Sequence, residues 1–193
     1  MRLCCAVDAL TGFLSPPMRP SCRGVRRSAA FAVRDEAYLP NYEEFVRAQG
    51  EMGGDGFLVT DIGYPPLQYI MDVLMGLNTF AEEWTERRDE VLRLYDALVE
   101  NRRKVYEVVA ESPALAANYE GNVSAEVVGV KRFEQYYMPH YDEFAEVMHA
   151  QDKLVGVHFD ANTWLLSEVI GRSGSVPRGV GMRWASGGRR MRG

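Results

Sequence analysis

The chain of 193 residues has a formal net charge of −5, and this small value hides a contrast between its ends and its middle. Residues 1–34 hold six Arg and one Asp, residues 35–170 hold 10 basic and 26 acidic side chains, and residues 171–193 hold six Arg and no acid. No apolar stretch reaches the roughly 18 residues that a membrane-spanning helix needs, so we expect no membrane segment.

The two ends differ in composition from the acidic middle. Both use Arg without Lys and are rich in Gly, Pro, Ser and Ala, a composition that does not support a packed core. We therefore predict a disordered or foreign segment at residues 1–34, a folded domain at residues 35–172 and a disordered tail at residues 173–193. An organellar transit peptide is the alternative interpretation of the first segment. Nucleic-acid binding is not expected, because aromatic residues are not interleaved with the arginines for base stacking.

The three cysteines, Cys4, Cys5 and Cys22, all lie in the first segment. The predicted domain therefore contains neither a disulfide framework nor a cysteine-based zinc cage. We expect a protein of the cytoplasm.

The middle of the chain alternates between strand and helix patterns. Short apolar runs bounded by turn residues predict buried strands at residues 57–61, 114–119 and 153–158. Apolar residues three and four positions apart predict helices at residues 36–49, 67–75, 79–86, 88–111, 131–151 and 162–170. Strands that are apolar on both faces and separated by helices indicate a parallel sheet with right-handed crossovers, which is an α/β fold.

Chemistry in such folds lies where the strands end and the loops begin, so the residues after each predicted strand are the candidates. His158 and Asp160 end the third strand two residues apart, a spacing that places both side chains on one face. Both are metal-ligand types. The alternative is that His158 is a hydrogen-bonded core residue and that Asp160 caps the helix near residue 162.

Two other strand ends carry candidates. Glu120 and Asn122 follow the second strand, where a carboxylate serves as a metal ligand or general base, or is simply a polar loop residue. Asp61 ends the first strand, and Tyr64 in the turn after it is a candidate for lining a substrate pocket. A rigid turn explains the two prolines beside Tyr64 equally well.

Several familiar enzyme motifs are absent from the chain. It has no phosphate-binding loop, no Gly-x-Gly-x-x-Gly, no Gly-x-Ser-x-Gly and no His-Glu-x-x-His. This excludes most of the common nucleotide-binding, hydrolase and metalloprotease classes.

The runs DGFLVTDIGYPPLQYIMDVLMGLNTFAEEWTERRDEV and NYEGNVSAEVVGVKRFEQYYMPHYDEFAEVMHAQDKLVGVHFDAN resemble part of the uroporphyrinogen decarboxylase superfamily, which includes corrinoid-dependent methyltransferases. The most specific pieces are residues 120–124 and 153–162. The resemblance implies a (β/α)8 TIM barrel, a fold of about 250 residues, of which this chain supplies three to four β/α units as a partial barrel. After residue 171 the sequence departs from the family, as a change of reading frame would produce.

The resemblance implies different residues for the two branches of the superfamily. In the methyltransferases, a His-x-Cys pair and a late Cys hold zinc; His158 matches that histidine, Asp160 replaces the first cysteine, and the late cysteine is absent. Glu120 is then a third ligand, and a corrinoid carried by a partner protein supplies the methyl group. The decarboxylases bind a porphyrinogen with an early aspartate and N-terminal arginines, a region that this chain lacks.

We therefore expect a fragment of a superfamily enzyme whose parent is a zinc- and corrinoid-linked methyltransferase acting on a small molecule. One alternative is uroporphyrinogen decarboxylase, an enzyme of porphyrin biosynthesis. The other is a catalytically inactive remnant that at most binds a partner, because an unclosed barrel exposes sheet edges and an apolar face.

Overall fold

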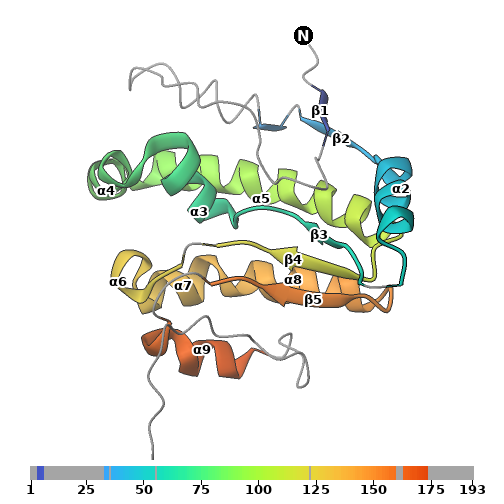
Figure 1. Ribbon diagram of the computed structural model, residues 1–193. Helices are drawn as coiled ribbons and strands as arrows, with labels where there is room; N and C mark the ends of the chain where they lie inside the picture. The colour runs from blue at the N-terminus through green and yellow to red at the C-terminus, as the bar shows by residue number, and fades with distance from the viewer. Residues whose placement is uncertain are drawn as a thin grey trace, which may run out of the picture.

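The chain forms a mixed α/β structure in which helices accompany a small parallel sheet (Figure 1). The computed structural model describes residues 4–6, 33–34, 36–54, 56–121, 123–159 and 163–173. Most of the two end segments therefore lies outside the described residues. Within the described residues, no helix combines the length and the apolar character needed to cross a membrane.

Three strands form the central sheet, at the three places where the sequence predicts them. They are β3 (Val59–Asp61), β4 (Ala116–Tyr119) and β5 (Leu154–Val157), and they are parallel in the order β3-β4-β5. The register places Asp61 opposite Asn118, and Asn118 opposite Gly156. Strands that follow in sequence are therefore neighbours in space, as β/α barrels require.

Helices connect the strands. After β3 come α3 (Pro66–Tyr69), the π-helix η1 (Ile70–Met75), α4 (Leu77–Glu86) and α5 (Arg88–Ala110). After β4 come α6 (Ala125–Val128), α7 (Val130–Tyr136) and α8 (Met138–His149), and after β5 come the 3-10 helix η2 (Trp164–Leu166) and α9 (Ser167–Arg172). The two long helices, α5 and α8, lie behind the sheet in Figure 1 and pack on each other.

The predicted helix at residues 36–49 is wrong at its start. Ala37–Leu39 is a strand, β2, which pairs in parallel with β1 (Cys4–Ala6), and the helix α2 (Tyr42–Met52) begins only after Asn41. The ring of Pro40 disfavours helical backbone at the residue before it, which separates the strand from the helix. Three residues of the first segment therefore belong to a small second sheet.

The predicted helix at residues 131–151 is broken in two. Helix α7 ends at Tyr136 and α8 begins at Met138, because Tyr137 has φ −116° and ψ −51°, outside the usual helical range. Pro139 follows in the first turn of α8. Backbone N–H groups in this turn have no acceptor within the helix, so the N–H that proline lacks does not cost a helical hydrogen bond. The apolar spacing continues across the break, so the sequence pattern alone does not mark it.

The core lies between the sheet and helices α5 and α8. Tyr106 of α5 and Tyr119 of β4 bring their hydroxyls to 2.9 Å from each other in a buried position. Phe144 of α8 packs on both rings, with centroid distances of 5.2 Å and 5.3 Å. These contacts join both long helices to the central strand.

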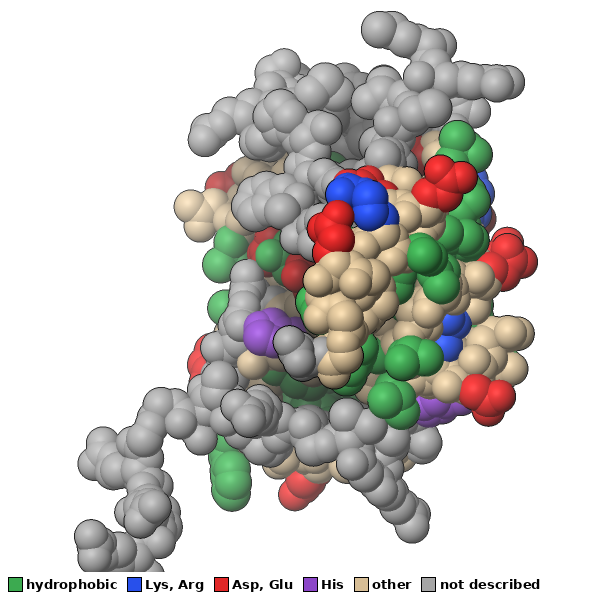
Figure 2. Space-filling view, turned by 45° about the vertical axis from the view of Figure 1, so that its right-hand side comes forward, with side chains coloured by type: hydrophobic (Ala, Val, Ile, Leu, Met, Phe, Trp, Pro, Cys, Tyr) green, Lys and Arg blue, Asp and Glu red, His purple; other side chains and the backbone are tan. Residues whose placement is uncertain are grey.

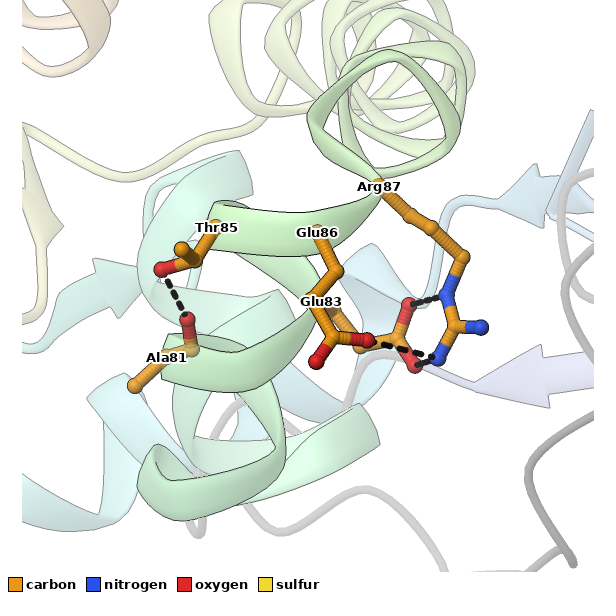
Figure 3. Close-up of polar contacts among 5 residues, drawn as sticks. All are labelled: Ala81, Glu83, Thr85, Glu86 and Arg87. Carbon is orange, nitrogen blue, oxygen red and sulfur yellow. Dashed lines mark hydrogen bonds and ion pairs between the residues drawn. The ribbon is translucent and has the colours of Figure 1, made fainter.

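An ion pair fixes the corner between α4 and α5 (Figure 3). Glu83 is 3 % exposed, and its two carboxylate oxygens accept hydrogen bonds of 3.0 Å and 2.8 Å from Nε and Nη2 of Arg87. Arg87 is the single residue between the two helices, so this bidentate ion pair stabilises the turn from α4 into α5.

Candidate functional site

The three strands continue their pairing just beyond their ends, and this places the candidate residues side by side. The amide of Ile62 donates to the carbonyl of Asn118 at 3.0 Å, and the amide of His158 donates to the carbonyl of Tyr119 at 2.9 Å. The amide of Glu120 donates to the carbonyl of Gly63 at 3.1 Å. The carboxyl ends of β3, β4 and β5 therefore form one continuous edge.

Strand alternation places the polar candidates on the face of the sheet that points away from α5 and α8. Thr60, Ala117 and Val155 form one row of the register and are buried on the helix side. Asp61 and Asn118 lie in the next row and project from the opposite face. Glu120 follows Asn118 by two residues, and His158 follows Gly156 by two, so these four side chains share one face.

The carboxylate of Asp61 is held from two sides. Its Oδ1 accepts a hydrogen bond of 2.6 Å from the amide of Gly63, and its Oδ2 accepts one of 3.1 Å from Nδ2 of Asn118. Gly63 has φ +73°, a conformation that favours glycine and allows the chain to turn back over the strand end. A buried arginine of α5, Arg102, donates to the carbonyl of Ile62 and supports the same turn.

Asn118 belongs to the candidate site although the sequence did not identify it. It lies inside β4, and its side chain has room only because residue 156 of the neighbouring strand is glycine. A Cβ at Gly156 would lie 2.7 Å from Oδ1 of Asn118. The hydrogen bond between Asp61 of β3 and Asn118 of β4 thus also depends on Gly156 of β5.

The other predicted site residues are only partly placed. Glu120 and Tyr64 are half-buried, and His158 is exposed. Asn122 and Asp160 lie outside the described residues. The structure therefore places only Glu120 of the predicted pair Glu120 and Asn122, and only His158 of the pair His158 and Asp160. Within the described residues, no three His, Cys, Asp or Glu side chains lie close enough to hold a metal ion.

A buried tyrosine lies beneath the loop that follows β4. Among the described residues the hydroxyl of Tyr141 has no hydrogen-bond partner, and burial raises its pKa well above the usual 10.0. A Cβ at Gly121 would lie 3.6 Å from this hydroxyl and 2.8 Å from Cγ2 of Val123, so only glycine fits there. The sequence gives no signal of this arrangement, because Tyr141 belongs to the apolar face of α8.

The connections at the two ends of the sheet differ in length. At the carboxyl ends of the strands, residues 62–87 and 120–137 carry additional helices before the long helices begin. At the opposite end, residues 111–115 and 150–153 connect helix to strand directly, and Nζ of Lys153 donates to the carbonyls of Ser112 and Ala114 at 2.5 Å and 2.6 Å. Elaborate loops at the carboxyl end are the usual arrangement around a β/α active site.

A small apolar crevice lies on the helix side of the sheet, away from the candidate edge. Its volume is about 40 Å³, and it is lined by residues of β2, α2, β3 and α5, among them Phe45, Thr60 and Val105. The hydroxyl of Thr60 has no partner in the described part of the chain. A crevice of this volume has room for a few water molecules, and we do not place a substrate there.

Comparison of the chain with protein-family models, with curated proteins and with solved structures found no match.

Proposed function

We propose that this chain is part of a β/α enzyme that acts on a small molecule at the carboxyl edge of β3, β4 and β5. The observation that supports this proposal is the row of polar side chains on the face of the sheet opposite α5 and α8, which is formed by Asp61, Asn118, Glu120 and His158. Asp61, Asn118 and Glu120 are half-buried at the carboxyl ends of parallel strands, which is where β/α folds bind their ligands, and this position favours a binding role.

The residues of the edge suit different tasks according to their positions. Asp61 is anchored through both carboxylate oxygens, so it orients a ligand or accepts a hydrogen bond without moving. Glu120 and His158 follow the strand ends, where their side chains have access to a bound molecule and are able to take up or release a proton. This division supports proton transfer at a positioned substrate.

The resemblance to the uroporphyrinogen decarboxylase superfamily makes the proposal more specific. Under this proposal the parent enzyme is a methyltransferase whose methyl donor is a corrinoid carried by a partner protein, and the methyl acceptor binds at the strand edge. The parallel order β3-β4-β5 supports the barrel that the superfamily requires. Uroporphyrinogen decarboxylase remains the alternative within the same superfamily.

Zinc is a separate proposal. Among the described residues, Asp61, Glu120 and His158 are the ligand types at this edge, but no three such side chains lie close enough to hold a metal ion, and a protein zinc site takes three or four ligands. A zinc site therefore depends on Asp160, which lies outside the described residues. The proton-transfer roles above do not involve a metal.

We expect His158→Ala to remove zinc from the purified chain. The wild-type chain is expected to retain about one zinc per molecule after exhaustive dialysis, and the variant to retain none, since removing one ligand typically weakens such sites by orders of magnitude. Elemental analysis after dialysis measures the stoichiometry. His149→Ala is the matched control, because His149 is exposed at the end of α8, which leads into the start of β5 at the opposite end of the sheet from the candidate edge. Full zinc content in His158→Ala would show that this ligand assignment is wrong.

A non-catalytic remnant is the second candidate function, and a specific observation favours it. β3 and β5 are the outer strands of the central sheet, and Val59 and Leu154 on these strands are 42 % and 48 % exposed. Figure 2 shows further hydrophobic side chains at the surface of the molecule. Open edges and exposed apolar groups favour self-association. A monodisperse monomer in analytical ultracentrifugation would contradict this candidate.

A further inference from the structure

Two arginines stack on one tryptophan beside the corner between α4 and α5. The guanidinium carbon of Arg88 lies 4.5 Å from the ring centroid of Trp84, and that of Arg132 lies 5.7 Å from it. Tyr136 packs edge-on against Trp84 with a centroid distance of 5.5 Å, and its hydroxyl accepts a hydrogen bond of 3.2 Å from Nη2 of Arg88. Both guanidinium groups are therefore held in place by aromatic residues of α4 and α7.

Neither of these arginines has a carboxylate partner in the described part of the chain. The arginines that do form ion pairs with glutamates there are Arg34, Arg47, Arg87, Arg93, Arg103 and Arg172. Acidic side chains outnumber basic ones by 26 to 10 in residues 35–170, so partners for Arg88 and Arg132 are plentiful in the sequence. Arg88 and Arg132 are therefore two stacked cations without a carboxylate partner among the described residues.

The two positive charges are close enough to repel each other. Since both distances are measured to the same ring centroid, the guanidinium carbons are at most 10.2 Å apart. This is comparable to the Debye length of about 8–10 Å at physiological salt, so solvent ions screen the repulsion only in part. A cation–π contact contributes about 0.5–1 kcal/mol at an exposed site, which makes stacking alone a weak reason to bring two cations together.

The cluster lies at the end of the molecule where the candidate edge is. α4 belongs to the long connection after β3, and α7 belongs to the long connection after β4. Figure 1 shows both helices at the end of the sheet towards which the strands run. A ligand held by these arginines would thus bind on the elaborated side of the fold.

We propose that Arg88 and Arg132 form a binding site for a small molecule with two anionic groups, carboxylate or phosphate. Each guanidinium binds one anionic group with its planar fork of N–H donors, and the two negative charges remove the repulsion between the cations. The stack on Trp84 holds both forks before the ligand arrives, which reduces the entropy lost on binding. This inference does not depend on the proposed methyl transfer.

Calorimetric titration of the full chain at constant ionic strength tests the proposal. The probes are citrate and pyrophosphate, with acetate as the anion of single charge. We expect saturable binding of at least one polyanion at one site with a Kd below about 1 mM, and no measurable binding of acetate. Arg88→Met and Arg132→Met should each weaken the binding at least tenfold. Arg93→Met is the matched control, because Arg93 lies on the same helix as Arg88 but is paired with Glu90. This variant should bind the polyanion with unchanged affinity.

Two results would overturn the proposal. One is the absence of saturable binding for both polyanions, and the other is an equal loss of affinity in Arg93→Met, which would indicate a general charge effect. Circular dichroism checks that each variant is folded. If a Met variant is unfolded, Arg88→Lys and Arg132→Lys replace it. The lysine variants keep the positive charge but lack the planar N–H donors of the guanidinium group. We therefore expect at least a threefold loss of affinity for the polyanion, and an unchanged affinity would contradict the proposal.

Discussion

Acid is expected to destabilise the fold between about pH 6.5 and pH 4, and His140 is a main cause. This side chain of α8 is 4 % exposed, and its Nε2 lies 2.6 Å from the hydroxyl of Tyr95. The pKa of His140 is lowered from 6.5 to about 4, mainly by burial; Glu143 opposes this shift, and Arg103 and Arg102 add to it. The folded state therefore favours neutral imidazole.

The sign of the effect follows from the two pKa values. Above pH 6.5 the histidine is neutral in both states, so it does not affect the pH dependence. As the pH falls below 6.5, the unfolded chain binds a proton that the folded chain does not bind until about pH 4. Over this interval the free energy of unfolding falls by about 3 kcal/mol from this group.

Urea denaturation at pH 7.0, 5.5 and 4.5 measures the effect of His140. His140→Gln keeps a hydrogen-bonding partner for Tyr95 but does not titrate, so its stability should fall less than that of the wild type over this range. The difference in pH dependence between the wild type and His140→Gln gives the contribution of His140 separately from that of the carboxylates. His149→Gln is the control, since His149 is exposed on the same helix. An identical pH dependence in His140→Gln and the wild type would disprove the assignment.

Phe144→Ala is expected to cost about 3–5 kcal/mol of folding free energy, as large-to-small changes in a closed core do. Phe144 is fully buried and packs on Tyr106 and Tyr119, so its loss opens a cavity where α5, α8 and β4 meet. A domain of this size is stable by about 5–15 kcal/mol in total. The variant should therefore unfold at a much lower urea concentration.

A matched substitution on the surface separates packing from residue type. Phe57 is 53 % exposed, and Phe57→Ala should change the stability by no more than about 0.5 kcal/mol. If Phe144→Ala unfolds like the wild type, the described packing of Phe144 is wrong. If no cooperative transition is seen in any of the chains, the described core is not a folded unit and the enzyme proposal loses its basis.

The fold was predictable where local pattern and tertiary structure agree. The runs that contain Val59, Ala117 and Val155 are short, apolar and bounded by turn residues, and each forms a strand. Ala37–Leu39 was missed because its partner is Cys4–Ala6, more than thirty positions earlier, and a pairing at that separation leaves no local signal. The strands were also expected to be apolar on both faces, which is wrong at Asp61 and Asn118.

The candidate site was predictable in part for a similar reason. Asp61, Glu120 and His158 directly follow or end apolar runs, and in a parallel sheet this position alone predicts the candidate edge. Asn118 was missed because it lies within a strand, and its role depends on a glycine in the neighbouring strand. The hydroxyl of Tyr141, which has no hydrogen-bond partner in the described part of the chain, is identified only in three dimensions, because its lack of a partner depends on the residues that surround it.

The most direct test of the central claim is a methyl-transfer assay on the full chain. Methylcobalamin serves as the methyl donor, a small thiol as the acceptor, and loss of the donor's absorbance in the dark measures turnover. We predict turnover above the protein-free rate, and a loss of about 100-fold or more in Glu120→Gln, the size usually found when an acid–base group is removed. Glu146→Gln, at an exposed position of α8, should match the wild type. A protein-free rate in the wild type, or full turnover in Glu120→Gln, would contradict a catalytic role for this strand edge.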